Sequence, residues 1–541
     1  MCRSSSCLRL FAIPLLAALF LSAQSTAAAQ THAFHELPAV AAELLERPIT
    51  LQTGIAHASD SVGTTSPDAQ KFYDQGLTYL HHFEWIQAAR SFNQALRLDA
   101  RLALAFAGIS TAQVELNQST AARATFARAR ALTSSLSEHD RRHLEIADLR
   151  LAALADSSKI SAYRKALDDA IVRFPKDAEF LLERGVAESP DINDRGQGSP
   201  VSSIRFYNQV LTVVPDHFAA HHYLTHAYEN GGRIDEALTH GTAYAKAAPG
   251  IAHARHMHGH DLRRLGRVEE AIAEFEAANR LEAAAIKSLG FPPEDNWHYE
   301  HNLDLLGTSY QYTGRIAKAD ETLRMAFDLP TANLAQAVNK RQWTVFLRSR
   351  GRADDALNAA RSLATFPHPV GQAIGHIEAG YALMMKRQFA EAARETNAAL
   401  AAMKSAPAGA GLAAVPFEGL QGEFFLRTGQ REKGRAILDA MIAKARAAQG
   451  PDDWAQALFT LEAVAKAARE VDDWEFAARA ARQMLEHDPS YAGTHYALAL
   501  VAEHAGDRAT AAKEFATAAK YWERADPDFP ELRDARGKAA R

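Results

Sequence analysis

The chain has 541 residues, of which 60 are basic and 65 are acidic, and its formal net charge at pH 7 is −5. A general nucleic-acid binder needs clustered positive charge, so this mild acidity argues against nucleic acid as a partner. The two cysteines, Cys2 and Cys7, both lie close to the N-terminus.

Residues 1–29 have the features of a secretory signal peptide. Arg3 and Arg9 supply positive charge, residues 10–21 form an apolar run, and three alanines precede Gln30 as a small-residue cleavage site. The apolar run is too short to span a membrane. We therefore expect an exported bacterial protein, periplasmic or secreted, whose mature chain has no transmembrane segment. Loss of both cysteines with the signal would leave no thiol chemistry.

Residues 30–68 form an N-terminal segment and linker without a clear repeat. Residues 32–52 are predicted to contain one helix, and residues 56–67 are a Ser/Thr-rich stretch that favours a linker. Two later stretches, residues 189–200 and residues 286–299, interrupt the repeat described next and are predicted to be loops or insertions. The second of these precedes a helix that we expect to open at His301.

A 34-residue pattern begins at Ala69. Counting Ala69 as position 1, Phe72, Gly76 and Ala88 occupy positions 4, 8 and 20, and Phe106 stands 34 residues after Phe72. The chain thus resembles the tetratricopeptide repeat (TPR) family, in which small residues at positions 8 and 20 let two antiparallel helices pack closely. The same frame returns from Phe218, Ala252, Glu300, Ala337, Ala373 and Ala492.

The resemblance implies an all-α, right-handed α-solenoid of about twelve helix-turn-helix repeats. We divide it into N-terminal repeats over residues 69–217, central His-rich repeats over 218–333, and C-terminal repeats with a polar cap over 334–541. The segments HYLTHAYE, HARHMHGH and EHNLDLLG make the central part similar to exported bacterial TPR proteins with His-rich repeats.

Of the 23 histidines, 11 fall between His217 and His301, in or next to the central repeats. In the TPR family, positions 2, 5, 9 and 12 of the first helix of each repeat line a concave groove. The family frame therefore places in one groove nine candidate ligand-binding residues: His222, His226, Glu229, His253, His256, His260, Arg263, His301 and Asp304. His221 and His258 fall on packing positions, and we interpret them as structural.

Three functions fit this cluster. The groove can recognise a protein, a peptide or a small ligand, which is our first interpretation. Alternatively, imidazoles spaced i, i+4 can chelate Zn, Cu or Ni, and the candidate ligands are His222, His226, Glu229, His256, His260 and His301. A histidine beside a carboxylate can also act in acid–base catalysis. We assign no catalytic residue, because HYLTH has Tyr223 where the HExxH zinc-peptidase motif needs Glu.

The N-terminal features predict that the exported chain begins at Gln30 or within a few residues of it. Intact-mass measurement of protein recovered from the periplasm or the medium tests this. A mass that still includes Met1 would contradict export through a cleaved signal.

Overall fold

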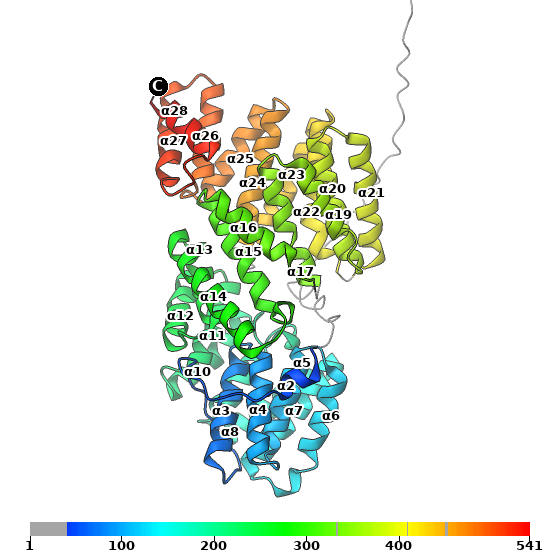
Figure 1. Ribbon diagram of the computed structural model, residues 1–541, viewed down its shortest axis with the longest axis vertical. Coiled ribbons are helices and arrows are strands. Elements are labelled where there is room, and N and C mark those ends of the chain that lie inside the picture. The colour runs from blue at the N-terminus through cyan, green and yellow to red at the C-terminus, as the bar shows by residue number, and fades with distance from the viewer. Residues whose placement is uncertain (1–39, 332–333, 408, 449–452, 541) are drawn as a thin grey trace, which may run out of the picture.

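The computed structural model describes residues 40–331, 334–407, 409–448 and 453–540, and the expected signal sequence lies outside them. The described residues form helices and no strand (Figure 1). The α-helices are α2 (Ala42–Glu46), α3 (Pro67–His81), α4 (Trp85–Leu98), α5 (Ala103–Glu115), α6 (Ser119–Arg130), α7 (Glu138–Ala155), α8 (Ile160–Arg173), α9 (Ala178–Val186), α10 (Ile204–Val213), α11 (Phe218–Asn230), α12 (Ile234–Ala247), α13 (Ala252–Arg264), α14 (Val268–Leu289), α15 (Trp297–Tyr312), α16 (Ile316–Asp328), α17 (Leu334–Asn339), α18 (Arg341–Ser349), α19 (Ala353–Leu363), α20 (Pro369–Met385), α21 (Phe389–Ser405), α22 (Gly411–Arg427), α23 (Arg431–Ala447), α24 (Asp453–Glu470), α25 (Trp474–His487), α26 (Ala492–His504), α27 (Arg508–Tyr521) and α28 (Pro530–Ala539).

These helices stack in consecutive pairs along the long axis of the molecule, which confirms the predicted TPR-like all-α solenoid (Figure 1). In the repeats that begin at Ala69, Phe218, Ala252, Glu300, Ala337, Ala373 and Ala492, position 15 lies in the turn between the paired helices and has a left-handed backbone, as at Gly232 and Gly266 with φ of 71° and 73°. Glycine adopts this conformation without steric cost. In the first repeat the same position holds Phe83, with φ of 62°.

Glycine at position 8 lets the two helices of a pair approach each other. A Cβ atom on Gly259 of α13 would lie 2.6 Å from Cε1 of Phe275 on α14, and one on Gly307 of α15 would lie 2.6 Å from Cγ of Leu323 on α16. The pattern of small residues in the sequence therefore corresponds to close helix–helix contacts in the fold.

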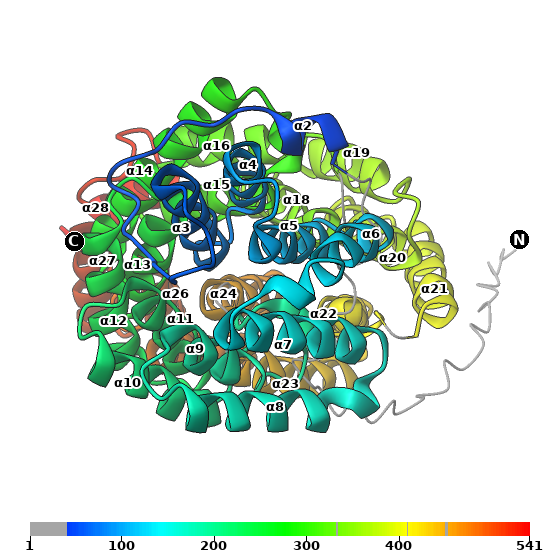
Figure 2. The same ribbon diagram turned by 90° about the horizontal axis from the view of Figure 1, so that it is seen from below.

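The solenoid also folds back on itself, so repeats far apart in the sequence touch. His81, at the end of α3, lies with its Nδ1 3.0 Å from the hydroxyl of Tyr223 on α11. Arg90 of α4 donates to the carbonyl of Leu289 at the end of α14 at 2.9 Å. Viewed along the long axis, the helix pairs wind around that axis (Figure 2). The first repeat thus packs against the central repeats.

The C-terminal repeats make a second closure onto α15 and the turn that follows it. The hydroxyl of Tyr312 donates to Oδ2 of Asp488 at 2.8 Å, and the backbone N–H of Asp526 donates to the carbonyl of Gly314 at 3.1 Å. The concave side of the central repeats is therefore lined by other parts of the same chain.

Three local expectations need correction. Within the described residues, the helix predicted over 32–52 is reduced to the short α2 (Ala42–Glu46). The predicted linker packs on the fold, since Ala58 and Val62 are buried. The insertion predicted over 286–299 is helical at both ends, because the helix formers after Glu282 prolong α14 until Gly290 turns the chain, and α15 opens at Trp297 instead of His301.

The stretch 189–200 is a loop with one short 3-10 turn, as the sequence predicted. Within the described part of the chain, no helix combines the length and the apolar character that crossing a membrane requires.

Replacing Gly259 by alanine should destabilise the protein. The new methyl group would press on the ring of Phe275, and overpacking of this kind costs about 1–3 kcal/mol in the free energy of unfolding. Gly537→Ala is the control, because a Cβ there meets nothing within 4 Å. Chemical denaturation followed by circular dichroism measures both variants. Equal stability of the two would contradict the close contact between α13 and α14.

Candidate functional site

The predicted histidines converge from three neighbouring helices. His222 and His226 come from α11, His253, His256 and His260 from α13, and His301 from α15. Because each of these is the first helix of its repeat, stacking places them side by side. The sequence predicted that these side chains share a concave groove. The first five of them are at most 8% exposed, so this part of the groove is covered in the structure.

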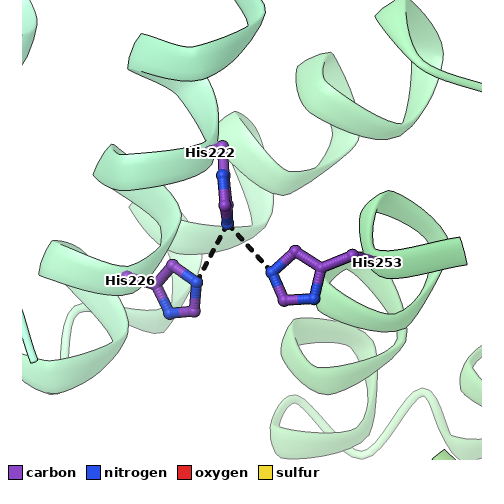
Figure 3. Close-up of side chains that lie close together, drawn as sticks. All are labelled: His222, His226 and His253. Atoms are coloured by element: carbon purple, nitrogen blue, oxygen red, sulfur yellow. Dashed lines mark hydrogen bonds between the residues drawn. The ribbon is translucent and has the colours of Figure 1, made fainter. Parts of the chain in front are cut away.

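Three of the rings, His222, His226 and His253, form what we call the first histidine triad (Figure 3). The Nε2 atom of His222 lies 3.1 Å from Nε2 of His226 and 2.9 Å from Nε2 of His253. All three nitrogens lie within 4.8 Å of one another. They face a single point between α11 and α13, which is the arrangement that a metal ion requires of its ligands.

The turn of the first repeat covers the first triad. The ring centroid of Phe83 lies 4.6 Å from that of His222 and 5.2 Å from that of His253. Trp297, at the start of α15, lies on another side with its ring 6.1 Å from His253. The burial of the triad therefore comes from the closure of the solenoid.

The outward nitrogens of two triad members have defined partners. Nδ1 of His222 donates to the backbone carbonyl of His81 at 2.7 Å. Nδ1 of His253 lies 2.6 Å from Nε2 of His298, whose own Nδ1 lies 2.9 Å from Oε1 of Glu282. The other oxygen of Glu282 accepts a short hydrogen bond from the amide of Asn296. A carboxylate, two imidazoles and the triad are thus linked in one chain.

The second histidine triad consists of His256, His260 and His301, whose ligand atoms also lie within 4.8 Å of one another. Nδ1 of His256 donates to Oδ1 of Asn302 at 3.0 Å, and the Asn302 amide donates to the Phe275 carbonyl at 3.0 Å. Neither ring nitrogen of His260 makes a hydrogen bond, although the side chain is 3% exposed. Its Nδ1 stands 3.5 Å from Oε1 of Glu229.

The remaining predicted residues lie beside the triads. Glu229 is 3.6 Å from a guanidinium nitrogen of Arg264, and Arg263 donates to the carbonyl of Leu305 at 3.4 Å. Arg263 and Asp304 line a separate small cavity, together with Phe459 of α24. The structure thus divides the predicted metal ligands between two triads, adds His253 to the first, and leaves Glu229 next to His260.

Burial keeps the imidazoles of the first triad, and those of His256 and His298, neutral at neutral pH. It lowers the pKa of His226 to about 4 and that of His298 to about 3. It also lowers the pKa values of His222, His253 and His256 well below the usual range, and neighbouring histidines add to this effect. A neutral imidazole has a lone pair on one nitrogen, and this is the form that binds metals.

Sequence reasoning missed the outer partners: His81, Glu282, His298 and Asn302. The TPR frame considers groove positions of first helices, whereas Glu282 lies on α14, a second helix, and His81 acts through its backbone from another repeat. His298 stands before the helix start that the sequence predicted. Its position three residues before His301, on one helix face, was the available signal.

No family model matches the chain, and no curated protein matches it. Among solved structures, the chain is similar to yeast Tom70 with a TM-score of 0.32 and 13% identity, over 87% of this chain and 95% of that one. It is similar to the APC/C hetero-tetramer Cut9-Hcn1 with a TM-score of 0.31 and 12% identity, over 87% and 96%. Likeness at this level carries no argument about function, and the TPR-like assignment stands on the helix pairs and turns of the chain itself.

Acid should destabilise the metal-free protein through these buried imidazoles. Burial lowers the pKa of His226 from 6.5 to about 4. Between these two pH values the unfolded chain binds a proton at this residue and the folded chain does not. Stability is therefore present above about pH 6.5 and is lost as the pH falls, by about 2 kcal/mol at pH 5 for this residue.

His226→Gln should lose less stability than the wild type between about pH 7.5 and pH 5. Urea denaturation of both proteins at the two pH values, with a chelator present, gives the difference between the two losses. This difference cancels the pH dependence of the groups that do not interact with His226, whereas the imidazoles of His222 and His253 are coupled to it. An equal loss in both proteins would contradict a depressed pKa at His226.

Proposed function

We propose that this TPR-like solenoid is a metal-binding protein that holds a transition-metal ion in the first histidine triad. Three imidazole nitrogens supply three ligands, and the fourth position of a tetrahedral ion stays open for water or another ligand. Zinc is the occupant that this donor set favours, and copper or nickel also suit imidazole. The proposal is supported by the hydrogen bonds on the outer side of the rings. They determine which ring nitrogen carries a proton and therefore which lone pairs face the centre of the triad.

The His222 ring has one possible neutral form. The carbonyl of His81 can only accept a hydrogen bond, so Nδ1 of His222 must be the protonated nitrogen. Its lone pair is then on Nε2, the atom that faces the other two rings. Orientation of a ligand by a backbone carbonyl in this way is typical of metal-binding histidines.

The chain from Glu282 to His253 can hold its protons in two arrangements. With Glu282 ionised, Nδ1 of His298 donates to it, Nδ1 of His253 donates to Nε2 of His298, and the lone pair of His253 is on Nε2. Two lone pairs, those of His222 and His253, then face each other at 2.9 Å with no proton between them. This arrangement is repulsive unless a cation occupies the space.

In the second arrangement Glu282 is protonated, every hydrogen bond of the chain reverses, and Nε2–H of His253 donates to Nε2 of His222. This is the form of the metal-free protein, and burial of Glu282 favours it by raising the pKa of the carboxyl. Binding of a metal ion would then displace the Nε2 proton of His253. The proton of Glu282 would pass to Nδ1 of His298 and the Nε2 proton of His298 to Nδ1 of His253, so that one proton is released in total and Glu282 ends ionised. Coupling of metal binding to proton release is general for imidazole ligands.

The distances within the triad fit a small ion. A tetrahedral zinc ion with bonds of about 2.0–2.1 Å to nitrogen keeps its ligand atoms about 3.3 Å apart. The two measured separations, 3.1 Å and 2.9 Å, are slightly shorter, so binding requires the rings to move apart by a few tenths of an ångström.

The second triad supports the same function at a neighbouring position. Because Oδ1 of Asn302 accepts from Nδ1 of His256, the lone pair of His256 is on Nε2. His260 is buried without a hydrogen bond to either nitrogen, and unsatisfied buried polar groups are costly. A metal ion bound there would satisfy it.

Recognition of a protein partner remains a proposal for the solenoid as a whole, because stacked helix pairs present extended surfaces. The histidines contribute to it only by shaping the fold, since the turn of the first repeat covers them. Export to a periplasm, which the N-terminal sequence predicts, is likewise proposed and is compatible with metal capture.

Isothermal titration of untagged protein with Zn, Cu and Ni at about pH 7.5 tests metal binding. We expect saturable binding that weakens as the pH falls, because binding releases the proton that the chain from Glu282 to His253 holds in the metal-free protein. His222→Ala, His226→Ala and His253→Ala should each remove binding at the first triad. Glu282→Gln should weaken it about 10–100-fold, because it removes only an outer partner.

His240→Ala is the matched control, because His240 is paired with His221 through Nδ1 atoms 2.8 Å apart, outside both triads. It should bind metal as the wild type does. Absence of heat for all three metals, with an unchanged melting temperature, would overturn the proposal. Equal binding by His222→Ala and the wild type would show that metal is held elsewhere.

A further inference from the structure

A third cluster of ligand-type side chains lies in the N-terminal repeats, apart from both histidine triads. It consists of Asp60, His139, His143 and Asp177, which we call the Asp–His cluster. Asp60 belongs to the irregular segment before α3, the two histidines are one turn apart on α7, and Asp177 is the N-cap of α9. The N-terminal segment and α9 thus each bring one carboxylate to this place, and α7 brings two imidazoles.

The two imidazoles and one carboxylate are in close contact. Nε2 of His139 lies 2.7 Å and Nε2 of His143 lies 3.1 Å from the same oxygen, Oδ2 of Asp177. The two Nε2 atoms are 3.2 Å apart. Both rings therefore turn the same nitrogen toward one point and do not pair with separate acceptors.

The second carboxylate faces this point without forming a hydrogen bond to either ring. The oxygens of Asp60 lie 3.7 Å from Nε2 of His139 and 3.6 Å from Nε2 of His143. These distances exceed those of hydrogen bonds to nitrogen. They are close to the edge of a coordination tetrahedron around zinc, which is about 3.3 Å for bonds of about 2.0 Å.

Outer contacts fix the ligands in this orientation. Oδ1 of Asp177 accepts the backbone N–H groups of Glu179 and Phe180 at 2.9 Å and 3.1 Å, which leaves Oδ2 for the cluster. Nδ1 of His139 faces Oδ1 of Asp140 at 3.4 Å. The ring of His143 stacks on Phe180 with centroids 3.9 Å apart. A carboxylate behind a ligating histidine and a fixed ring are typical outer-shell features of metal sites.

We propose that the Asp–His cluster is a closed zinc site with two imidazole and two carboxylate ligands. Four protein ligands complete a tetrahedron and leave no open position, which is characteristic of a structural zinc site. Two carboxylates balance the charge of the ion, so the occupied site is neutral. This neutrality suits a location where the four side chains are between 8% and 25% exposed.

The ion would fasten the irregular N-terminal segment to the solenoid. Asp60 is the ligand from this segment, which also provides the carbonyl of Ile55 to Nε2 of His82 at 2.6 Å. His82 directly precedes Phe83 in the turn that covers the first histidine triad. Zinc at the Asp–His cluster therefore stabilises the segment on which the position of that turn depends.

Metal analysis of untagged full-length protein, after dialysis with zinc and removal of excess, tests the proposal. The variant Asp60→Asn/Asp177→Asn should contain one zinc ion fewer per chain than the wild type and should melt at a lower temperature. The amide that Asp177→Asn introduces would keep an oxygen for the cap of α9, so the variant should remain helical by circular dichroism. His376→Ala is the control, since His376 pairs with Glu395 alone, at 2.7 Å.

Cobalt substitution gives a second measurement. In a His222→Ala/His226→Ala/His256→Ala background, which removes ligands from both histidine triads, the intact Asp–His cluster should show the visible absorption of tetrahedral cobalt. Asp60→Asn in that background should lose the signal. A zinc content that is equal in the wild type and in Asp60→Asn/Asp177→Asn, or zero in the wild type after dialysis with zinc, would overturn the proposal. The comparison between the wild type and Asp60→Asn/Asp177→Asn does not depend on whether the first triad binds metal.

Discussion

The contact of the α3–α4 turn with the concave side of α11 and α13 is the interaction on which the rest of the site depends. It places the ring of Phe83 over three imidazoles and removes them from water. Buried polar groups without partners are expensive, so the burial also dictates what must surround them. The partners come from the same closure: the carbonyl of His81 reaches His222 because the first repeat packs on α11.

This closure separates the protein from a simple solenoid, in which each repeat contacts its immediate neighbours only. Bonds such as that between Arg90 and Leu289, or between Tyr312 and Asp488, join residues that are 199 and 176 positions apart. They turn the concave surface, which is exposed in an open solenoid, into an interior. A concave surface inside the protein can hold a small ion far more readily than it can hold a peptide.

The sequence predicted the parts of this structure that depend on neighbouring repeats. Glycine at positions 8 and 15 has local steric reasons, so Gly259 and Gly266 identified the helix pair and its turn correctly. Grouping of histidines from α11, α13 and α15 followed from stacking. The long-range closure could not be predicted in this way, because it depends on the accumulated twist of several repeats. The burial of the histidines and the role of His81 were missed for that reason, and Asp60 was missed because it lies outside the repeat frame.

Phe83 shows how the repeat frame and the site are connected. Position 15 of a repeat needs a left-handed backbone, which costs about 1–2 kcal/mol for a residue with a Cβ atom. Several repeats have glycine there, whereas the first has Phe83 with φ of 62°. The ring gains contacts with His222, His226 and His253 that a glycine cannot make, and these offset the backbone cost. The histidine rings that Phe83 covers thus compensate for a residue that is unfavourable in the turn.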